Sequence, residues 1–460
     1  MSNDEKARAS QSNTTPWRFL PELLTLTARF AGSGSLYLGL LIIFGIGCLV
    51  SDTFLTAANQ RDVLRQVSQN GILAVGMTLV IITAGIDLSV GRMLGLGSTL
   101  AAMLLVGKRW TAATWFALPT ASAAAGILVS LLVSAFLFGR QGDLRTGPVK
   151  GLTLSAARFR FLVSGLSFLV AAALVAGWAV PQVDSGLGIL TVLIIVPLAG
   201  MMLGGLSGVI VTKCRLQPFI VTLAMMTSAY GAARLIAAGG STGYIHSLYD
   251  SEGNVPPGVD WLRTVDSAKL GDLIQSWAPG WLDDFLRREG TQQVSDLIPV
   301  PGLFFLLCLA IGMFILNRLR FGRYIYAIGG NEETARLSGI NVNRVKIAVY
   351  ALSGMLSFLA GVLACAQYRQ GKPDMGGMAE LDAIAAVVIG GTSLMGGRGR
   401  MIGTLVGVLI FGYLTNILSL CGVSTDVQLF ITGIIIVVAV LLQEGFLQRL
   451  VFRWRRREAK

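Results

Sequence analysis

Long runs of apolar residues are the feature that most limits how this chain can fold. A membrane-spanning helix needs about 20 such residues, or fewer where neighbouring helices cover it. The runs lie at approximately residues 36–55, 71–86, 91–107, 113–138, 161–180, 187–211, 218–238, 302–317, 346–367, 382–396, 401–420 and 427–444. The pattern predicts an all-α fold, a polytopic membrane helical bundle of about 12 transmembrane helices.

Composition supports a location in a lipid bilayer. Hydrophobic residues make up 53% of the chain and charged residues 13%, whereas soluble proteins average about 25% charged residues. Glycine supplies 56 of the 460 residues, and small residues allow membrane helices to approach closely. We therefore expect extensive packing of helix against helix.

The net charge of +12 raises the possibility of nucleic-acid binding, but the basic residues lie mostly in short connections and in the C-terminal tail. A cytoplasmic N-terminus followed by twelve crossings places every strong basic cluster on one side of the membrane, as the positive-inside rule requires. These clusters contain Arg140, Arg145, Lys150, Arg158, Arg160, Lys213, Arg215, Arg318, Arg320 and Arg323. Membrane orientation, with no nucleic-acid partner, explains the charge, and both termini are expected in the cytoplasm.

The same reasoning divides the chain into three parts. Residues 1–35 form a cytoplasmic N-terminal tail, residues 36–445 the transmembrane domain, and residues 446–460 a basic cytoplasmic C-terminal tail. The longest external loop, residues 240–301, contains nine acidic and four basic residues, a local balance of 4 − 9 = −5. An acidic loop of this kind suits the outer, periplasmic side.

A polar segment with several arginines, FGRYIYAIGGNEETARLSGI at residues 321–340, lies between two of the apolar runs. Asn331 is suited to cap a helix, Glu332 and Glu333 suit its first turn, and Gly339 suits its end. A short helix over Gly329–Ile340 at the membrane face would offer a docking surface. The alternative interpretation is an ordinary solvated loop.

Two apolar runs are interrupted in a similar way, at ITAGIDLSVGRMLG (Ile82–Gly95) and IGGTSLMGGRGRMIG (Ile389–Gly403). The similarity indicates a weak internal repeat, and transporters place binding or gating elements at such paired breaks. The alternative is that the glycines only make tight turns between helices. The candidate gate and pathway residues are Asp87, Ser89, Gly91, Asp382, Gly390, Gly391, Thr392, Ser393, Gly396 and Gly397.

Asp87 is the most informative charge in these runs, because an acid within a membrane segment is a functional candidate by default. Capping of the helix that starts at Ser89, or a part in a gate, is favoured over a proton relay, since neither a histidine nor a second acid lies at helical spacing. Arg234 lies near the outer end of its run and is expected to extend its charge toward the interface.

The sequence offers little for catalysis or metal binding. The five cysteines show neither CxxC nor Cys/His spacing, and His246 is the single histidine. A G-x-x-x-x-G-K-[ST] phosphate loop is also absent from the sequence, so ATP chemistry would have to come from another chain. We expect a protein that is not an enzyme and that binds neither a cofactor nor a metal.

Three long motifs identify the most similar family. They are AVGMTLVIITAGIDLSVG (Ala74–Gly91), GRYIYAIGGNEETARLSGINVNRVKIAVYALSG (Gly322–Gly354) and ELDAIAAVVIGGTSLMGGRGRMIGTLVG (Glu380–Gly407). With RLQPFIVTLAMM (Arg215–Met226), they closely resemble the membrane subunits of bacterial ribose-type sugar ABC importers, in the branched-chain amino acid/sugar permease superfamily.

The resemblance implies a permease subunit of the bacterial inner membrane that works as a homodimer or paired permease around a central pathway. Such a subunit receives a monosaccharide from a periplasmic sugar-binding protein and is driven by a cytoplasmic ABC ATPase subunit that uses the ATP. It also implies that the polar segment is the ATPase-coupling helix. The residues concerned are Gly329, Gly330, Asn331, Glu332, Arg336, Leu337, Ser338, Gly339 and Ile340.

Two departures from the family pattern stand out. The family implies ten spans, whereas residues 113–181 add what we interpret as an inserted hairpin of two spans, and the external loop at 240–301 is longer than the family requires. An ion-coupled secondary transporter of a small polar solute remains the alternative, because that class also uses paired broken helices.

Overall fold

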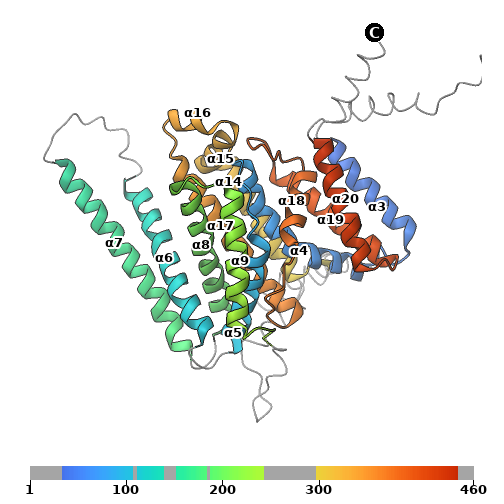
Figure 1. Ribbon diagram of the computed structural model, residues 1–460, viewed down its shortest axis with the longest axis horizontal. Coiled ribbons are helices and arrows are strands. Elements are labelled where there is room, and N and C mark those ends of the chain that lie inside the picture. Colours follow the sequence, from blue (N-terminus) through green and yellow to red (C-terminus); the bar gives the residue numbers. More distant parts are fainter. Residues whose placement is uncertain (1–33, 107–110, 139–151, 184–186, 243–296, 444–460) are drawn as a thin grey trace, which may run out of the picture. The chain divides into compact units, whose positions relative to one another are not determined.

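The structure, a computed structural model, describes residues 34–106, 111–138, 152–183, 187–242 and 297–443 (Figure 1). Every regular element in these ranges is a helix. Seven helices are long and apolar enough to cross a membrane, and three further apolar helices are shorter, at Leu36–Val50, Val90–Val106 and Thr425–Ile435. A polytopic helical membrane protein is therefore confirmed, while the count of twelve spans stays a prediction.

Each predicted apolar run overlaps a helix. In chain order these helices are α3 (Gly34–Val50), α4 (Ala57–Ile82), α5 (Val90–Val106), α6 (Ala112–Phe138), α7 (Leu152–Ala179), α8 (Ile189–Lys213), α9 (Pro218–Ile236), α14 (Val300–Arg318), α17 (Val342–Tyr368), α18 (Ala379–Ile389), α19 (Met401–Leu420) and α20 (Thr425–Gln443). The polar segment adds α15 (Arg320–Gly330) and α16 (Glu332–Leu337), and a 3₁₀ turn, η2 (Val180–Gln182), follows α7.

The chain divides into two compact units. The first contains the described residues before Thr53 and after Gly412, where the rings of Phe44 and Tyr413 pack edge to face with centroids 5.5 Å apart. The second, Thr53–Gly412, contains every candidate site residue and is built around α17.

Glycines bring α8 and α17 into direct backbone contact at the centre of the second unit. Gly200, Gly204 and Gly208 recur every four residues and therefore lie on one face of α8. A Cβ atom on Gly204 would lie 2.2 Å from the carbonyl oxygen of Tyr350, and one on Gly354 would lie 2.4 Å from the carbonyl oxygen of Gly200. The glycine content expected to serve close helix packing does so here.

The run at 382–396 is not one continuous span, which corrects the sequence interpretation. Helix α18 ends at Ile389 after 11 residues, a length of only ~16 Å. The chain then turns through Gly391, Gly396 and Gly397, whose φ angles are +85°, +84° and +71°. Glycine reaches such positive φ angles readily, and they are incompatible with a right-handed α-helix. The chain therefore leaves the helix after Ile389.

Helices α6 and α7 form an antiparallel pair, and α6 also packs against α8. The end of α6 and the start of α7 lie at the same end of the second unit as α15 and α16 (Figure 1). The connection that carries Arg140, Arg145 and Lys150 and most of the predicted external loop lie outside the described residues. The assignment of 113–181 as an insertion stays a prediction.

The contact between α8 and α17 predicts different effects for two neighbouring glycines. Gly204→Ala should lower the thermal unfolding midpoint of the purified protein in detergent, because the new methyl group overlaps the α17 backbone; overpacking of this kind costs about 1–3 kcal/mol. Gly205→Ala is the matched control, since its Cβ would lie 3.7 Å from the Ala351 side chain, an ordinary contact. Equal midpoints for the two variants would contradict the packing described here.

Candidate coupling helix and gate

The polar segment folds into two helices, with its predicted caps in place. Asn331 Oδ1 accepts a hydrogen bond from the backbone N–H of Thr334 at 2.9 Å and so caps α16. Gly339 has a φ of +83° and directly follows Ser338, the residue that caps the other end of this helix. The predicted start at Gly329 is wrong, however, because Gly329 and Gly330 are the last two residues of α15 and the second helix of the polar segment begins at Glu332.

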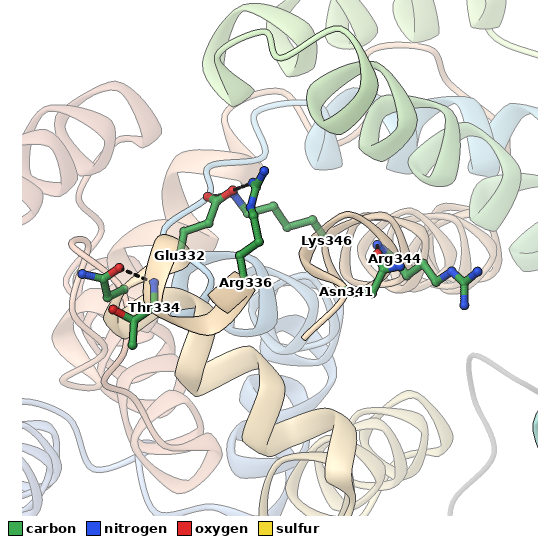
Figure 2. A network of polar contacts seen from close by, with 7 residues as sticks. Glu332, Thr334, Arg336, Asn341, Arg344 and Lys346 are labelled. Atoms are coloured by element: carbon green, nitrogen blue, oxygen red, sulfur yellow. Dashed lines mark hydrogen bonds and ion pairs between the residues drawn. The ribbon is translucent and has the colours of Figure 1, made fainter. Parts of the chain in front are cut away.

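Glu332 fastens α16 to the central helix α17. Its carboxylate accepts hydrogen bonds from Arg336 at 3.1 Å and from Lys346 Nζ at 2.5 Å (Figure 2). Partial burial raises the pKa of Glu332, but the hydrogen bonds and positive charges of Lys346 and Arg336 outweigh it, and the net pKa is below its usual value. The carboxylate is therefore ionised at neutral pH, and this attachment is lost only as the pH falls through the lowered pKa.

Most of α16 is left uncovered by the rest of the chain. Ala335 is buried against it, whereas Glu333 and Arg336 are exposed and Leu337 keeps 81% of its surface exposed. A short, capped helix that is held by one buried residue and one ion pair, and that ends in an exposed leucine, has the form of a docking element.

The two interrupted runs meet each other at α15. The N–H of Gly397 donates to the carbonyl oxygen of Ile82 at 2.9 Å. A Cβ on Gly329 would lie 1.7 Å from that same oxygen and 2.4 Å from the nitrogen of Gly397, and a Cβ on Gly396 would lie 2.8 Å from the Ala84 side chain. We call these five residues, Ile82, Ala84, Gly329, Gly396 and Gly397, the glycine junction.

A tyrosine makes a second contact between α15 and the second break. The hydroxyl of Tyr326 donates to the carbonyl oxygen of Gly399 at 2.8 Å. The polar segment thus touches both breaks, although it was predicted from the sequence as a separate element. In the sequence, this contact could have been suspected only from the two adjacent glycines, Gly329 and Gly330, and such a pair is equally typical of a loop.

Asp87 fastens the first break to α17. Its side chain is buried, with 1% of the residue exposed. Oδ1 accepts from the Ser89 N–H at 3.1 Å and from the Ser89 hydroxyl at 2.6 Å, and Oδ2 accepts from the Ser353 hydroxyl at 2.8 Å. Helix α5 begins immediately afterwards, at Val90, so Asp87 organises the start of this helix and links it to α17.

The remaining gate candidates lie in two other places. Gly91 packs against Glu380 and Gly376, and Asp382 lies in the first turn of α18. Gly390 packs against Gly403 of α19. Gly391, Thr392 and Ser393 form the turn after α18, where the N–H of Thr392 donates to Val387 and that of Ser393 to Arg398. The predicted set is therefore spread over four locations.

Metal ligands do not gather in the part of the chain that the structure describes, where groups of three His, Cys, Asp or Glu side chains suited to a metal ion are absent. The arrangement instead offers hydrogen bonds, ion pairs and close backbone contacts. These interactions can hold or transmit a conformation.

The glycine junction predicts a sharp contrast between two adjacent residues. Gly329→Ala should lower the thermal unfolding midpoint in detergent, because its Cβ would overlap the backbones of both breaks. Gly330→Ala should leave the midpoint unchanged, since nothing lies within 4 Å of its Cβ position. Overlap with backbone costs about 1–3 kcal/mol. A stable Gly329→Ala variant would show that α15 does not seat against the breaks.

Comparison with known proteins finds a family and individual relatives that match most of this chain. The family described as branched-chain amino acid transport system / permease component matches residues 60–140 and 158–440. The ribose import permease protein RbsC of Haemophilus influenzae is 34% identical over 413 residues, which cover 90% of this chain and 93% of that protein. RbsC of Escherichia coli strain K12 is 35% identical over 407 residues, covering 88% and 91%.

A second group of relatives is named for a different sugar, xylose. The xylose transport system permease protein XylH of Escherichia coli strain K12 is 33% identical over 407 residues, which cover 86% of this chain and 87% of that protein. No solved structure matches the chain. With the family match spanning most of the described helices and with relatives above 30% identity over nine tenths of the sequence, the chain belongs to the branched-chain amino acid transport system / permease component family.

Proposed function

We propose that the protein is the transmembrane permease subunit of an ATP-binding cassette importer that translocates a monosaccharide, a ribose-like pentose or a related sugar. The observation that carries this proposal is the similarity to ribose import permeases over about nine tenths of the chain. The xylose relative supports a pentose-sized sugar without choosing among sugars.

The family implies three partners for the permease. A periplasmic sugar-binding protein delivers the sugar, a cytoplasmic ATPase subunit supplies the energy, and a second permease copy or a paired permease completes the pathway. The bacterial inner membrane is the corresponding location. Neither ATP nor another cofactor is assigned to this chain.

The proposed topology has twelve spans and cytoplasmic termini, with tails at 1–35 and 446–460 and the transmembrane domain at 36–445. Its support is the positive-inside pattern and the arrangement of the second unit. The α6–α7 connection carries basic residues, and the ends of these helices lie at the same end of the unit as α15 and α16 (Figure 1). Both regions would then face the cytoplasm, and the loop at 240–301 would face the periplasm.

Helix α16 is the proposed site at which the ATPase docks. Its exposed face is available to a groove on a partner, and the ion pair of Glu332 with Lys346 connects the docked helix to α17. The glycine junction connects α15 to both breaks. Movement of the coupling segment would therefore reach the breaks directly, without a flexible linker.

The paired breaks are the proposed inner gate. The first break follows α4, whose last residue, Ile82, lies beside Gly329 of α15, and the second break reaches α15 through Gly396, Gly397 and Gly399. Each precedes a run that would return across the membrane. The hydrogen bonds of Asp87 hold the first break in one conformation, and the left-handed glycines set the path of the second. The gate is distinct from the place where the sugar is first received, which lies at the opposite side of the membrane.

Reconstitution in proteoliposomes tests the proposed function. Uptake of radiolabelled ribose should require the permease, the ATPase and the sugar-binding protein encoded with it, and should be unaffected when ionophores collapse the proton and sodium gradients. Uptake by the permease alone that stops with the ionophores would establish an ion-coupled secondary transporter instead.

The exposed end of α16 yields a specific test of docking. Leu337→Asp should lower ATPase-driven uptake by about tenfold or more, because removing a buried leucine contact costs about 1.5–3 kcal/mol and each 1.4 kcal/mol is a factor of ten. Glu333→Gln is the control, an exposed residue of the same helix. Membrane insertion of both variants should equal wild type. Full uptake by Leu337→Asp would exclude α16 as the docking helix.

A further inference from the structure

The connection between α17 and α18, residues Gly371–Met378, is irregular and packs on α5 along one side, while Lys372, Asp374 and Met378 are exposed. A Cβ on Gly371 would lie 2.8 Å from the side chain of Ala102, near the end of α5. A Cβ on Gly376 would lie 2.3 Å from the carbonyl oxygen of Gly91, near its start. Helix α5 is one of the shorter apolar helices, and the span predicted from the sequence at residues 91–107 would place this connection at membrane depth.

Asp374 lies partway along this connection. Its two neighbours pack on Gly95 of α5: a Cβ atom on Gly95 would lie 2.5 Å from the carbonyl oxygen of Pro373 and 2.7 Å from that of Met375. Gly95 lies only ~8 Å along the helix from the start of α5. The Asp374 side chain nevertheless keeps 76% of its surface exposed. Irregular backbone and charge at membrane depth occur where protein or a water-filled cavity surrounds them, so Asp374 should face water.

Asp374 is part of a polar cluster drawn from three elements. The hydroxyl of Tyr230 in α9 donates to Asp374 Oδ1 at 2.8 Å. The guanidinium group of Arg92 in α5 lies 4.5 Å from the centre of the Tyr230 ring and 3.8 Å from Asp374 Oδ1. Arg234 is exposed and donates to the Tyr230 hydroxyl at 3.3 Å. Its predicted extension toward the interface stays a prediction.

Glu380 adds an acceptor without a donor. Its Oε2 atom packs on Gly91 and is buried, with no hydrogen-bond partner among the described residues. Its charge interacts with that of Arg92. A buried carboxylate oxygen without a donor is unfavourable.

We propose that Arg92, Tyr230, Asp374 and Glu380 form a station at which the permease holds its polyhydroxylated solute during passage. The inference rests on the proposed function and adds a contact site to it. Carboxylates accept from sugar hydroxyls, the guanidinium group donates to them, and the tyrosine hydroxyl does both.

The station suits release as well as binding. Asp374 is largely exposed, accepts a hydrogen bond from Tyr230 and lies in an ion pair with Arg92. A passing sugar would replace these interactions with its own hydrogen bonds, and they would form again when it leaves. Transport requires binding that is weak enough to leave. A pathway site of this kind differs from the high-affinity site of a binding protein.

Thiol labelling tests whether the station is wet. In a variant whose five native cysteines are replaced, Asp374→Cys in the assembled, membrane-embedded importer should react with a charged, membrane-impermeant thiol reagent, and ribose-loaded binding protein with ATP should change its rate. Leu174→Cys is the control, on an apolar face of α7 with 67% of the leucine exposed, and should not react. An unreactive Asp374→Cys in every state would overturn the proposal.

Uptake measurements test contact with the sugar. Asp374→Asn should lower ribose uptake per ATP hydrolysed by about tenfold or more, the loss expected for one charged hydrogen bond, while stimulation of the ATPase by loaded binding protein and the thermal unfolding midpoint stay as in wild type. Asp62→Asn, in a surface ion pair with Arg65, is the control.

The outcomes separate the station from the importer itself. Equal uptake by Asp374→Asn and Asp62→Asn would reject the station even if the thiol of the Asp374→Cys variant is reactive. Lower uptake accompanied by a lower unfolding midpoint would also reject it, since Asp374 would then only hold the connection in place. Failure of the wild-type importer to take up ribose with ATP would instead reject the proposed function.

Discussion

Contact between backbones at glycine residues is the physical constraint on which this structure depends. Lipid provides no hydrophobic force between helices, so close packing must hold them together. At Gly204 and Gly354 that contact joins α8 to α17, and at Gly329 and Gly397 it joins α15 to both breaks. Any side chain at these positions would push apart elements that are far from each other in sequence.

Two routes lead from the exposed helix α16 to the proposed gate. One passes through α15 and the glycine junction. The other passes from Glu332 to Lys346 in α17, and from Ser353 in the same helix to Asp87 in the first break. Because both routes consist of short, direct contacts, a displacement of α16 would also displace the breaks.

Sequence reasoning succeeded where the signal is local. Apolar length located the helices, and the residue types at Asn331 and Gly339 located the cap and the end of α16. It failed at α18, where an apolar run continues through glycines whose positive φ angles end the helix. It also missed Lys346 and Ser353, because helices that are apolar on all sides do not reveal which face meets which partner. Asp374 was missed because it lies in the irregular connection between α17 and α18, where periodicity gives no signal.

The central claim is that α16 and the second break behave as one body. Spin labels at Glu333 and at Met395, both exposed, would report their separation by pulsed electron paramagnetic resonance in the assembled importer. The account predicts the same narrow distance distribution with and without ATP, in preparations that transport sugar. A separation that changes between the two states would show that the coupling helix and the break move independently, and would contradict the account.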